Sequence, residues 1–298
     1  MFNNERLTQV YQSAKELSFN NFSRIVLFSD CHRGDNSRAD DFVPVEPVFL
    51  TALKHYYSLG YTYIELGDAD ELWQFRDFSK IVSAHQEVFK LLRKLQLQQR
   101  YYSIWGNHDI FKKDRTFWES LRLKDGDRLL CGFESREGII LRHLETGSQI
   151  LLVHGHQVDP PNDRFWPLNC LLSRYLWRPL EIHLGIPDPS SPAKNHRRKN
   201  TIEKRIIEWV KQKQQAVIAG HTHLPVFPSI NEPPYFNCGG CIHPDGLTAI
   251  EITNGKIALV KWYAQQRNEE ISRVYKDYLA GPELLSGFFR KPFRNALP

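Results

Sequence analysis

Five short motifs rich in histidine and carboxylate occur along the chain, and each follows an apolar segment typical of a strand. In chain order they are Asp30-Cys31-His32, Gly67-Asp68-Ala69-Asp70-Glu71, Gly106-Asn107-His108-Asp109, His154-Gly155-His156 and Gly220-His221-Thr222-His223. In α/β sheets, the loops beyond the carboxyl ends of the strands gather at one crevice. The pattern therefore predicts an α/β fold in which the polar strand ends converge on one site.

Strand-like and helical segments alternate along the chain and support this fold class. The strand-like segments are short, apolar and bounded by glycine or polar residues. We expect strands at 24–30, 61–66, 101–105, 139–144, 150–153, 216–219, 235–237, 247–253 and 256–263. Helical spacing predicts helices at 47–59, 79–99 and 268–279, with an irregular tail after residue 281.

Composition and charge exclude several classes of protein. The chain has 298 residues, of which 41% are hydrophobic, and its formal net charge is +5. That apolar content excludes an intrinsically disordered chain, and the lack of a heptad or collagen period excludes a rod. The mild positive charge suits an anionic substrate or a membrane surface. Nucleic-acid binding needs clustered charge, and the dense basic run at 194–199 is short, so we do not expect a nucleic-acid partner.

Cysteine usage and the first residues bear on the compartment. The five cysteines are scattered and odd in number, unlike a secreted disulfide framework. The chain does not start with a basic region and an apolar run, the pattern of a signal peptide. We expect a cytoplasmic protein, with peripheral membrane contact left open. The pair Cys238 and Cys241 lacks the second cysteine pair of a tetrahedral zinc site, so we interpret it as part of a turn.

The segment 157–215 is too long for a plain connection between two strands. It contains an aromatic and leucine-rich part, a Pro/Ser linker at 187–192, and the basic run that enters a helix near Thr201. We interpret it as a helical insertion or lid within a single domain that spans 1–298.

The five motifs point to metal chemistry. Mixed carboxylate, imidazole and amide ligands suit divalent Mn, Fe, Zn, Co or Ni. Glycine beside the ligands allows sharp turns and close backbone approach. Each motif alone is common in turns, but all five in order, each at a strand end, form a specific signal.

With these motifs, the chain resembles the calcineurin-like metallophosphoesterase superfamily over residues 23–263, the insertion excluded. The resemblance implies a β-sandwich of two mixed sheets flanked by helices. It also implies two divalent ions, manganese foremost, that hydrolyse a phosphoester or pyrophosphate bond through attack by a metal-bound hydroxide. Two such ions clamp the attacking and leaving oxygens of an in-line displacement.

The resemblance also assigns roles to individual residues. One metal would be bound by Asp30, His32, Asp68 and His223. The other would be bound by Asp68, Asn107, His154 and His221, so that Asp68 bridges. His108 would be the catalytic histidine, and Glu71 matches the acid that orients it.

Further residues are candidates for substrate contact. Arg33, Asn36 and Arg38 follow the first motif and could meet phosphate, although an exposed polar loop would have the same composition. His156 could touch substrate or simply pack beside His154. Arg197 and Arg198 could meet a diphosphate or an anionic lipid, or they could be a solvated helix start.

The segment Gly-Asp-Ala-Asp-Glu-Leu-Trp at 67–73 resembles the UDP-2,3-diacylglucosamine pyrophosphatases, a branch of the superfamily with a helical insertion that holds acyl chains. The apolar residues that could line such a groove are Trp166, Leu171, Leu172, Tyr175, Leu176 and Trp177. They could equally pack the insertion on the core. That branch has arginine at the position of His108 and aspartate at that of His156, so a general phosphoesterase is the first expectation.

Two other functions stay open at this point. A nuclease of the same superfamily would need a basic groove with stacking aromatic residues. A non-catalytic metal-binding scaffold would not need the full ligand set together with His108. Metal content and hydrolysis of an aryl phosphate distinguish an enzyme from a scaffold. The partners expected are a phosphorylated small molecule or a lipid nucleotide, and the sequence leaves the oligomeric state open.

Overall fold

Two six-stranded sheets form the centre of the computed structural model, which describes residues 4–289 apart from 120, 124, 125, 127, 131, 181–195, 268 and 269. In spatial order, the first sheet contains β1 (Lys15–Phe19), β5 (Gly138–His143), β6 (Gln149–Val153), β7 (Ala216–Ala219), β9 (Tyr235–Cys238) and β8 (Pro225–Val226). The second contains β12 (Glu270–Leu284), β11 (Lys256–Arg267), β10 (Leu247–Thr253), β2 (Arg24–Phe28), β3 (Thr62–Leu66) and β4 (Tyr101–Ile104).

Both sheets are mixed. In the second, β2, β3 and β4 run parallel to one another, and β10 pairs antiparallel with β2. In the first, β6, β7 and β9 are parallel, whereas β5 pairs antiparallel with β6. Five of the parallel strands have their carboxyl ends in the same region between the two sheets. These strands are β2, β3, β4, β6 and β7.

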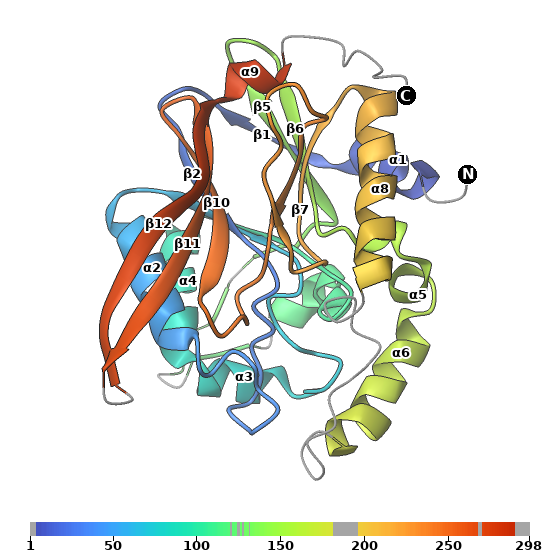
Figure 1. The fold of residues 1–298 in the computed structure, drawn as a ribbon. Helices are drawn as coiled ribbons and strands as arrows, with labels where there is room; N and C mark the ends of the chain where they lie inside the picture. Colours follow the sequence, from blue (N-terminus) through green and yellow to red (C-terminus); the bar gives the residue numbers. More distant parts are fainter. Residues whose placement is uncertain are drawn as a thin grey trace.

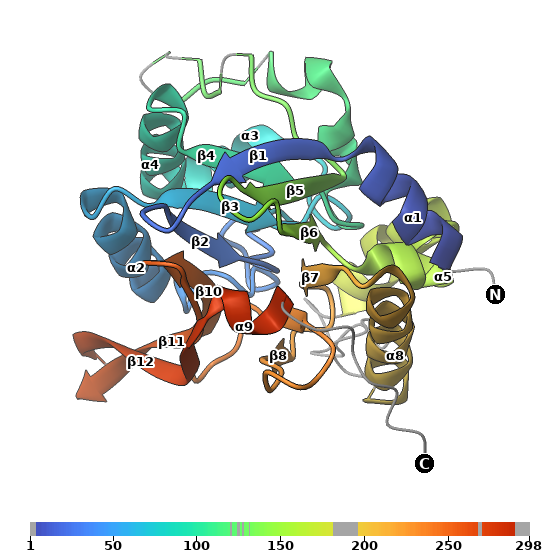
Figure 2. The same ribbon diagram turned by 90° about the horizontal axis from the view of Figure 1, so that it is seen from above.

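Helices cover the outer faces of both sheets, so the fold has four layers (Figures 1 and 2). The helices α1 (Asn4–Ser13) and α8 (His196–Lys213) share a core with the first sheet. The helices α2 (Glu46–Ser58), α3 (Phe78–Ala84) and α4 (Gln86–Leu97) share another with the second. A third core lies between the two sheets, where Leu27, Ile64 and Leu152 are fully buried. Because most inner strands are covered on both faces, their sequences are continuous apolar runs.

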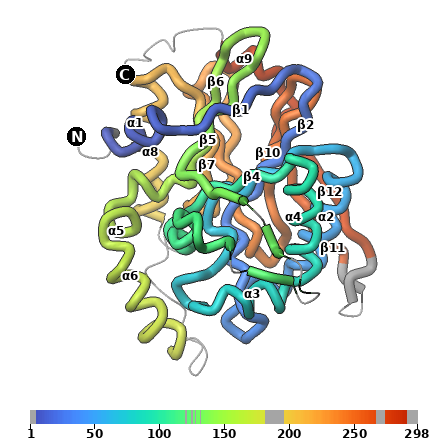
Figure 3. Tube along the Cα trace, turned by 180° about the vertical axis from the view of Figure 1, so that it is seen from behind, coloured from blue at the N-terminus to red at the C-terminus, as the bar shows by residue number. Residues whose placement is uncertain are grey.

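Shorter elements complete the chain. They are η1 (Ile110–Lys113), η2 (Arg115–Trp118), η3 (His156–Val158), α5 (Pro160–Asp163), α6 (Trp166–Leu172), η4 (Ser173–Trp177) and α9 (Leu285–Phe289). The elements α5, α6 and η4 extend beyond the sheets as an arm, as the view from behind shows (Figure 3). Among the described helices, none combines the length and apolar character that crossing a bilayer requires.

The expected fold class is confirmed, while some expected elements are wrong. The helix expected at 268–279 is wrong, because residues 270–279 belong to the long strand β12, which pairs antiparallel with β11. Residues 268 and 269 lie outside the described part of the chain. In that pairing Val274 lies opposite Ala264 and Tyr278 opposite Val260, so β-branched and aromatic side chains stack across strands. The helix α1 and the strands β1 and β8 were not expected from the pattern. The irregular tail expected after residue 281 is wrong up to residue 289, because β12 continues to Leu284 and α9 follows it.

Two further expectations concern helices. The single helix expected at 79–99 is interrupted at His85, whose ring is tied to Asp40 and Glu46. The segment 157–215 is helical at α5, α6, η4 and α8, and α8 packs on the first sheet through Ile206 and Trp209. The expected linker at 187–192 and Lys194 lie outside the described residues.

Candidate metal centre

The predicted ligands come from strand ends of both sheets and meet between them. Asp30, Asp68 and Asn107 follow β2, β3 and β4 of the second sheet. Three of the four histidine ligands follow β6 and β7 of the first sheet, at positions 154, 221 and 223, whereas His32 follows β2. His223 lies 3.0 Å from Asp30 and His154 lies 3.0 Å from Asp68, so residues separated by up to 193 positions form one cluster.

The backbone of this cluster is unusual. Nine non-glycine residues among those described have positive φ, and five of them are predicted ligands: Asp30, His32, Asp68, His221 and His223. Positive φ is disfavoured for side chains with a Cβ and concentrates at functional sites. Two glycines also permit close approach, because a Cβ on Gly106 would overlap Asp68 and one on Gly220 would overlap Ser29. The loops are shaped to aim side chains at a common point.

One group of ligand atoms consists of Asp30, His32 and His223. Nε2 of His223 lies 3.0 Å from Oδ1 of Asp30, and Nε2 of His32 lies 3.8 Å from the same oxygen. Oδ1 of Asp30 and Nε2 of His32 are buried without a hydrogen-bond partner. Buried polar atoms rarely stay unsatisfied, so an oxygen and a nitrogen left open here fit a bound cation.

A second group consists of Asp68, His154 and His221. Nδ1 of His154 donates to the carbonyl oxygen of Leu66 at 2.9 Å, so Nε2, which lies 3.0 Å from Oδ2 of Asp68, is the nitrogen available to a metal. Nε2 of His221 meets Oδ2 of Asp159 at 3.0 Å, which leaves Nδ1 of His221 for a metal. Histidine ligands commonly give their other nitrogen to a carbonyl or carboxylate in this way.

Asp68 connects the two groups, and the buried Asn107 has open polar atoms. Oδ2 of Asp68 faces both, at 3.0 Å from Nε2 of His154 and 4.0 Å from Nε2 of His32. The side chain of Asn107 is fully buried, and neither its oxygen nor its nitrogen has a hydrogen-bond partner. The residues therefore fit divalent ions, with Asp68 in the position of a shared ligand.

His108 stands beside the cluster and is held from two sides. Its Nδ1 lies 2.7 Å from Oε2 of Glu71, which also meets Nδ1 of His32 at 2.9 Å. Its ring stacks on Trp73, with centroids 4.1 Å apart and planes inclined by 25°. Burial alone would raise the pKa of Glu71, but the charge and hydrogen bond of His108, together with His32, lower it to about 2. Glu71 is thus an anion that fixes the imidazole and leaves Nε2 free.

The electrostatics favour a cation at the site. Burial opposes charge on Asp68, yet His154 and His108 hold its pKa well below the usual range. Burial would lower the pKa of His154, but Asp68 and Asp30 raise it to about 9. These histidines and carboxylates thus stabilise each other's charged forms. A divalent ion would replace the protons on the histidines.

Arg33 does not serve substrate, contrary to the sequence-based expectation. It is fully buried, with Nε 2.7 Å from Asp70 and Nη1 2.7 Å from Glu65. These two carboxylates compensate the buried charge of Arg33, so its side chain supports the loops of the site from within the protein. The local pattern Asp-Cys-His-Arg does not indicate whether the arginine is exposed or buried.

The other substrate candidates are placed differently. Asn36 and Arg38 are exposed on the loop after the first motif, and Arg197 is exposed at the start of α8. Arg198 is half-buried and binds both oxygens of Asp159. His156 is fully buried beside His154, with ring centroids 5.5 Å apart, so it does not face solvent.

Two carboxylates that support the site were not identified as such from the sequence. Asp159 orients His221, and the signal available was its position shortly after the His154 motif. Asp109 accepts from the amides of Gly106 and Ala69, at 2.7 and 3.1 Å, and from Lys112 at 2.6 Å. It therefore ties the loops after β3 and β4 together.

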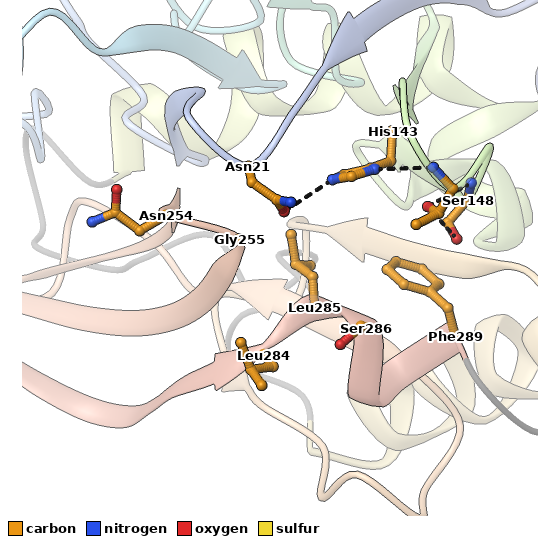
Figure 4. A pocket seen from close by; sticks show the side chains of 10 residues that line it. Asn21, His143, Ser148, Asn254, Gly255, Leu284, Leu285, Ser286 and Phe289 are labelled. Atoms are coloured by element: carbon orange, nitrogen blue, oxygen red, sulfur yellow. Dashed lines mark hydrogen bonds between the residues drawn. The ribbon is translucent and has the colours of Figure 1, made fainter.

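A pocket of about 560 Å³ lies elsewhere, at the opposite ends of the same strands. Figure 4 shows Asn21, His143 and Phe289 around it. Asn21 precedes β2 and Ser148 precedes β6, whereas the predicted ligands follow those strands. The pocket gathers no candidate ligands, so we place the chemistry at the metal cluster.

The calcineurin-like phosphoesterase family matches residues 23–225. The chain belongs to this family. No curated protein matches it in a whole-sequence search. The family assignment agrees with the ligand cluster, because every motif that supplies a ligand lies inside the matched range.

Solved structures give a weaker likeness. Vacuolar protein sorting 29 from Cryptosporidium parvum shares 15% identity, with a TM-score of 0.41, over 87% of this chain and 98% of that one. The zinc complex of Vps29 from Entamoeba histolytica shares 15% identity, with a TM-score of 0.41, over 86% and 98%. A cold-active protein-tyrosine phosphatase of Shewanella shares 13% identity, with a TM-score of 0.38, over 82% and 80%.

Proposed function

We propose that the protein is a dinuclear metal-dependent hydrolase of a phosphoester or pyrophosphate bond. The observation that supports the proposal is two neighbouring ligand groups, with Oδ2 of Asp68 in one group 4.0 Å from Nε2 of His32 in the other. Each group has buried polar atoms that lack a hydrogen-bond partner. Two divalent ions, manganese foremost, would polarise the phosphoryl group and supply an activated water. The mixed donor set equally admits Fe, Zn, Co or Ni.

The chain's own residues give His108 a defined part in the reaction. Its Nδ1 is held by Glu71, so Nε2 is the atom that can reach a phosphoryl oxygen or give a proton to the leaving group. The ring is only slightly exposed, which limits competition from bulk water. His108 is therefore positioned for electrostatic stabilisation or general-acid catalysis.

The test is turnover of an aryl phosphomonoester and an aryl phosphodiester by the manganese-loaded protein. We expect His108→Ala to lower kcat about 100-fold to 10,000-fold, the usual contribution of a positioned acid. The control is His243→Ala, because the side chain of His243 is 69% exposed and lies outside the ligand groups. If the wild type binds two ions but turns over neither ester, the non-catalytic scaffold becomes the better description.

A second candidate is an amphiphilic substrate such as a lipid nucleotide, and one observation favours it. The arm of α6 and η4 carries a row of exposed apolar side chains with exposed fractions of 41–68%. They are Phe165, Leu168, Leu171, Leu172, Tyr175 and Leu176. Such a face suits contact with acyl chains or with the cytoplasmic surface of a membrane.

A UDP-linked lipid and its headgroup alone distinguish the two candidates. If the lipid is the natural substrate, its kcat/KM should exceed that of the headgroup, and Leu172→Asp should remove the difference. Equal kcat/KM for both would leave the apolar face without a role in substrate choice.

A further inference from the structure

The inner side of the arm makes specific contacts that its exposed apolar side does not. Arg174 donates from Nε to the carbonyl oxygen of Trp73 at 2.9 Å and from Nη2 to that of Leu72 at 3.0 Å. Arg178 donates from Nη1 to the carbonyl oxygen of Gln74 at 3.0 Å. Two arginines four residues apart, on one helix face, thus bind three consecutive carbonyl oxygens of one turn.

That turn carries Trp73, whose ring stacks on His108. Trp73 is 3% exposed, and the stacking distance of 4.1 Å leaves no room for water between the rings. The ring centroids of His108 and His32 lie 4.8 Å apart, and the two rings are nearly perpendicular. Three contacts therefore restrict the imidazole: Glu71 at Nδ1, Trp73 on one face and His32 at the side.

Arg178 has further contacts that anchor the arm. Its guanidinium carbon lies 4.5 Å from the centroid of the Phe75 ring, and its Nη2 donates to Asp35 at 3.2 Å. Among the described residues, Arg174 has no carboxylate partner; it binds the two carbonyl oxygens and the sulfur of Cys170. Arg174 thus acts on the turn directly, while Arg178 also fixes the helix to the first-motif loop.

We propose that Arg174 is a positioning residue that sets the orientation of His108 through the turn at 72–74 and the ring of Trp73. The proposal rests on the proposed function and makes the arm a part of the active site's support. Because the guanidinium donates two hydrogen bonds at once, it fixes both the orientation of the turn and its distance from the arm. Because misplacement of a reacting group by about 1 Å can cost about 100-fold in rate, a shift of this turn matters at His108.

The first measurement is a double-mutant cycle on aryl phosphate turnover by the manganese-loaded protein. Arg174→Ala should lower kcat about tenfold to a hundredfold and leave KM within about threefold, since it acts on orientation and not on binding. Arg174→Lys should fall in between, because lysine keeps the charge but not the two-point contact. In the His108→Ala background, Arg174→Ala should have almost no further effect.

The matched control is Arg164→Ala. Arg164 is an exposed arginine of the same arm and, within the described part of the chain, makes no hydrogen bond with the turn at 72–74. It should leave kcat unchanged. If Arg174→Ala lowers kcat equally with and without His108, or no more than Arg164→Ala does, the proposal is overturned.

The second measurement does not depend on activity. In zinc-loaded protein, the ring protons of His108 should resonate upfield because they lie over the face of Trp73, and His108→Ala identifies these signals. Arg174→Ala and Trp73→Leu should both move them downfield, while Arg164→Ala should not. Unmoved His108 signals in Arg174→Ala would refute the positioning role even if turnover changed. If the wild type hydrolyses no ester, the proposed function fails, and the spectra still decide whether Arg174 orients His108.

Discussion

Asp30, His32 and Asp68 adopt a left-handed backbone that costs on the order of 1–3 kcal/mol per residue. Backbone hydrogen bonds between the loops hold this conformation. The amide of Asp30 donates to the carbonyl oxygen of Gly67 at 3.1 Å, and that of His32 donates to Asp68 at 2.9 Å. Each ligand loop is thus supported by its neighbour.

Asp159 offers a test of such support at the level of one residue. Its Oδ2 meets Nε2 of His221 at 3.0 Å and so keeps Nδ1 available for a metal. We expect Asp159→Asn to weaken metal affinity about tenfold to a hundredfold, the usual effect of losing a carboxylate behind a ligand histidine. Competition with a chelator measures it. Asp163→Asn, which removes the carboxylate at the end of α5 that pairs with Arg6, is the control, and equal losses in both variants would contradict the role of Asp159.

The break between α3 and α4 shows how an element boundary depends on a distant charge. His85 is buried, with Nε2 3.0 Å from Oδ2 of Asp40 and Nδ1 3.1 Å from Oε2 of Glu46. Burial alone would lower the pKa of His85, but hydrogen bonds and charge from these two carboxylates raise it to about 9. The protonated ring therefore links the helix pair to the loop before α2 and to the start of α2.

This link makes stability depend on pH at alkaline values. Because the folded pKa of His85 lies above the ordinary 6.5, its contribution is fully present below pH 6.5 and is lost as pH rises through 9. We expect the urea midpoint of the wild type to fall more than that of His85→Gln between about pH 6 and about pH 10. Parallel pH curves for the two proteins would show that His85 does not carry the dependence.

At the scale of the whole molecule, the candidate metal centre joins the two sheets. Asp30 and Asp68 extend from one sheet, whereas His154 and His223 extend from the other. Ions held between them would bind the folded state and not the separated strands. Metal binding should therefore stabilise the entire sandwich and not only the loops.

Thermal unfolding with and without metal measures this effect. Manganese at about 100 times its Kd should add about 2.7 kcal/mol to the free energy of unfolding and raise Tm. His223→Ala removes a ligand and should reduce the increase at the same metal concentration. His243→Ala, an exposed histidine outside the cluster, should keep the full increase. An equal increase in both variants would mean that the metal stabilises the protein elsewhere.

Local signals in the sequence determined the strands that carry the ligands and the order of the motifs. Short apolar runs of β-branched residues, each stopped by glycine and a polar side chain, specify a buried strand with a turn at its end. This holds for 62–66 and 216–219, which are β3 and β7. The ligand residues follow directly on such strands, so their convergence could be predicted.

Tertiary structure alone decided the features that depend on which layer covers a residue. The segment at 270–284 becomes a strand because β11 offers an open edge, and pairing there outweighs its helical spacing. Arg33 is buried because Glu65 and Asp70 approach from β3 and the loop after it, and Asp159 meets His221 from 62 residues away. Burial and partner choice arise from contacts between distant segments, and no local pattern in the chain encodes them.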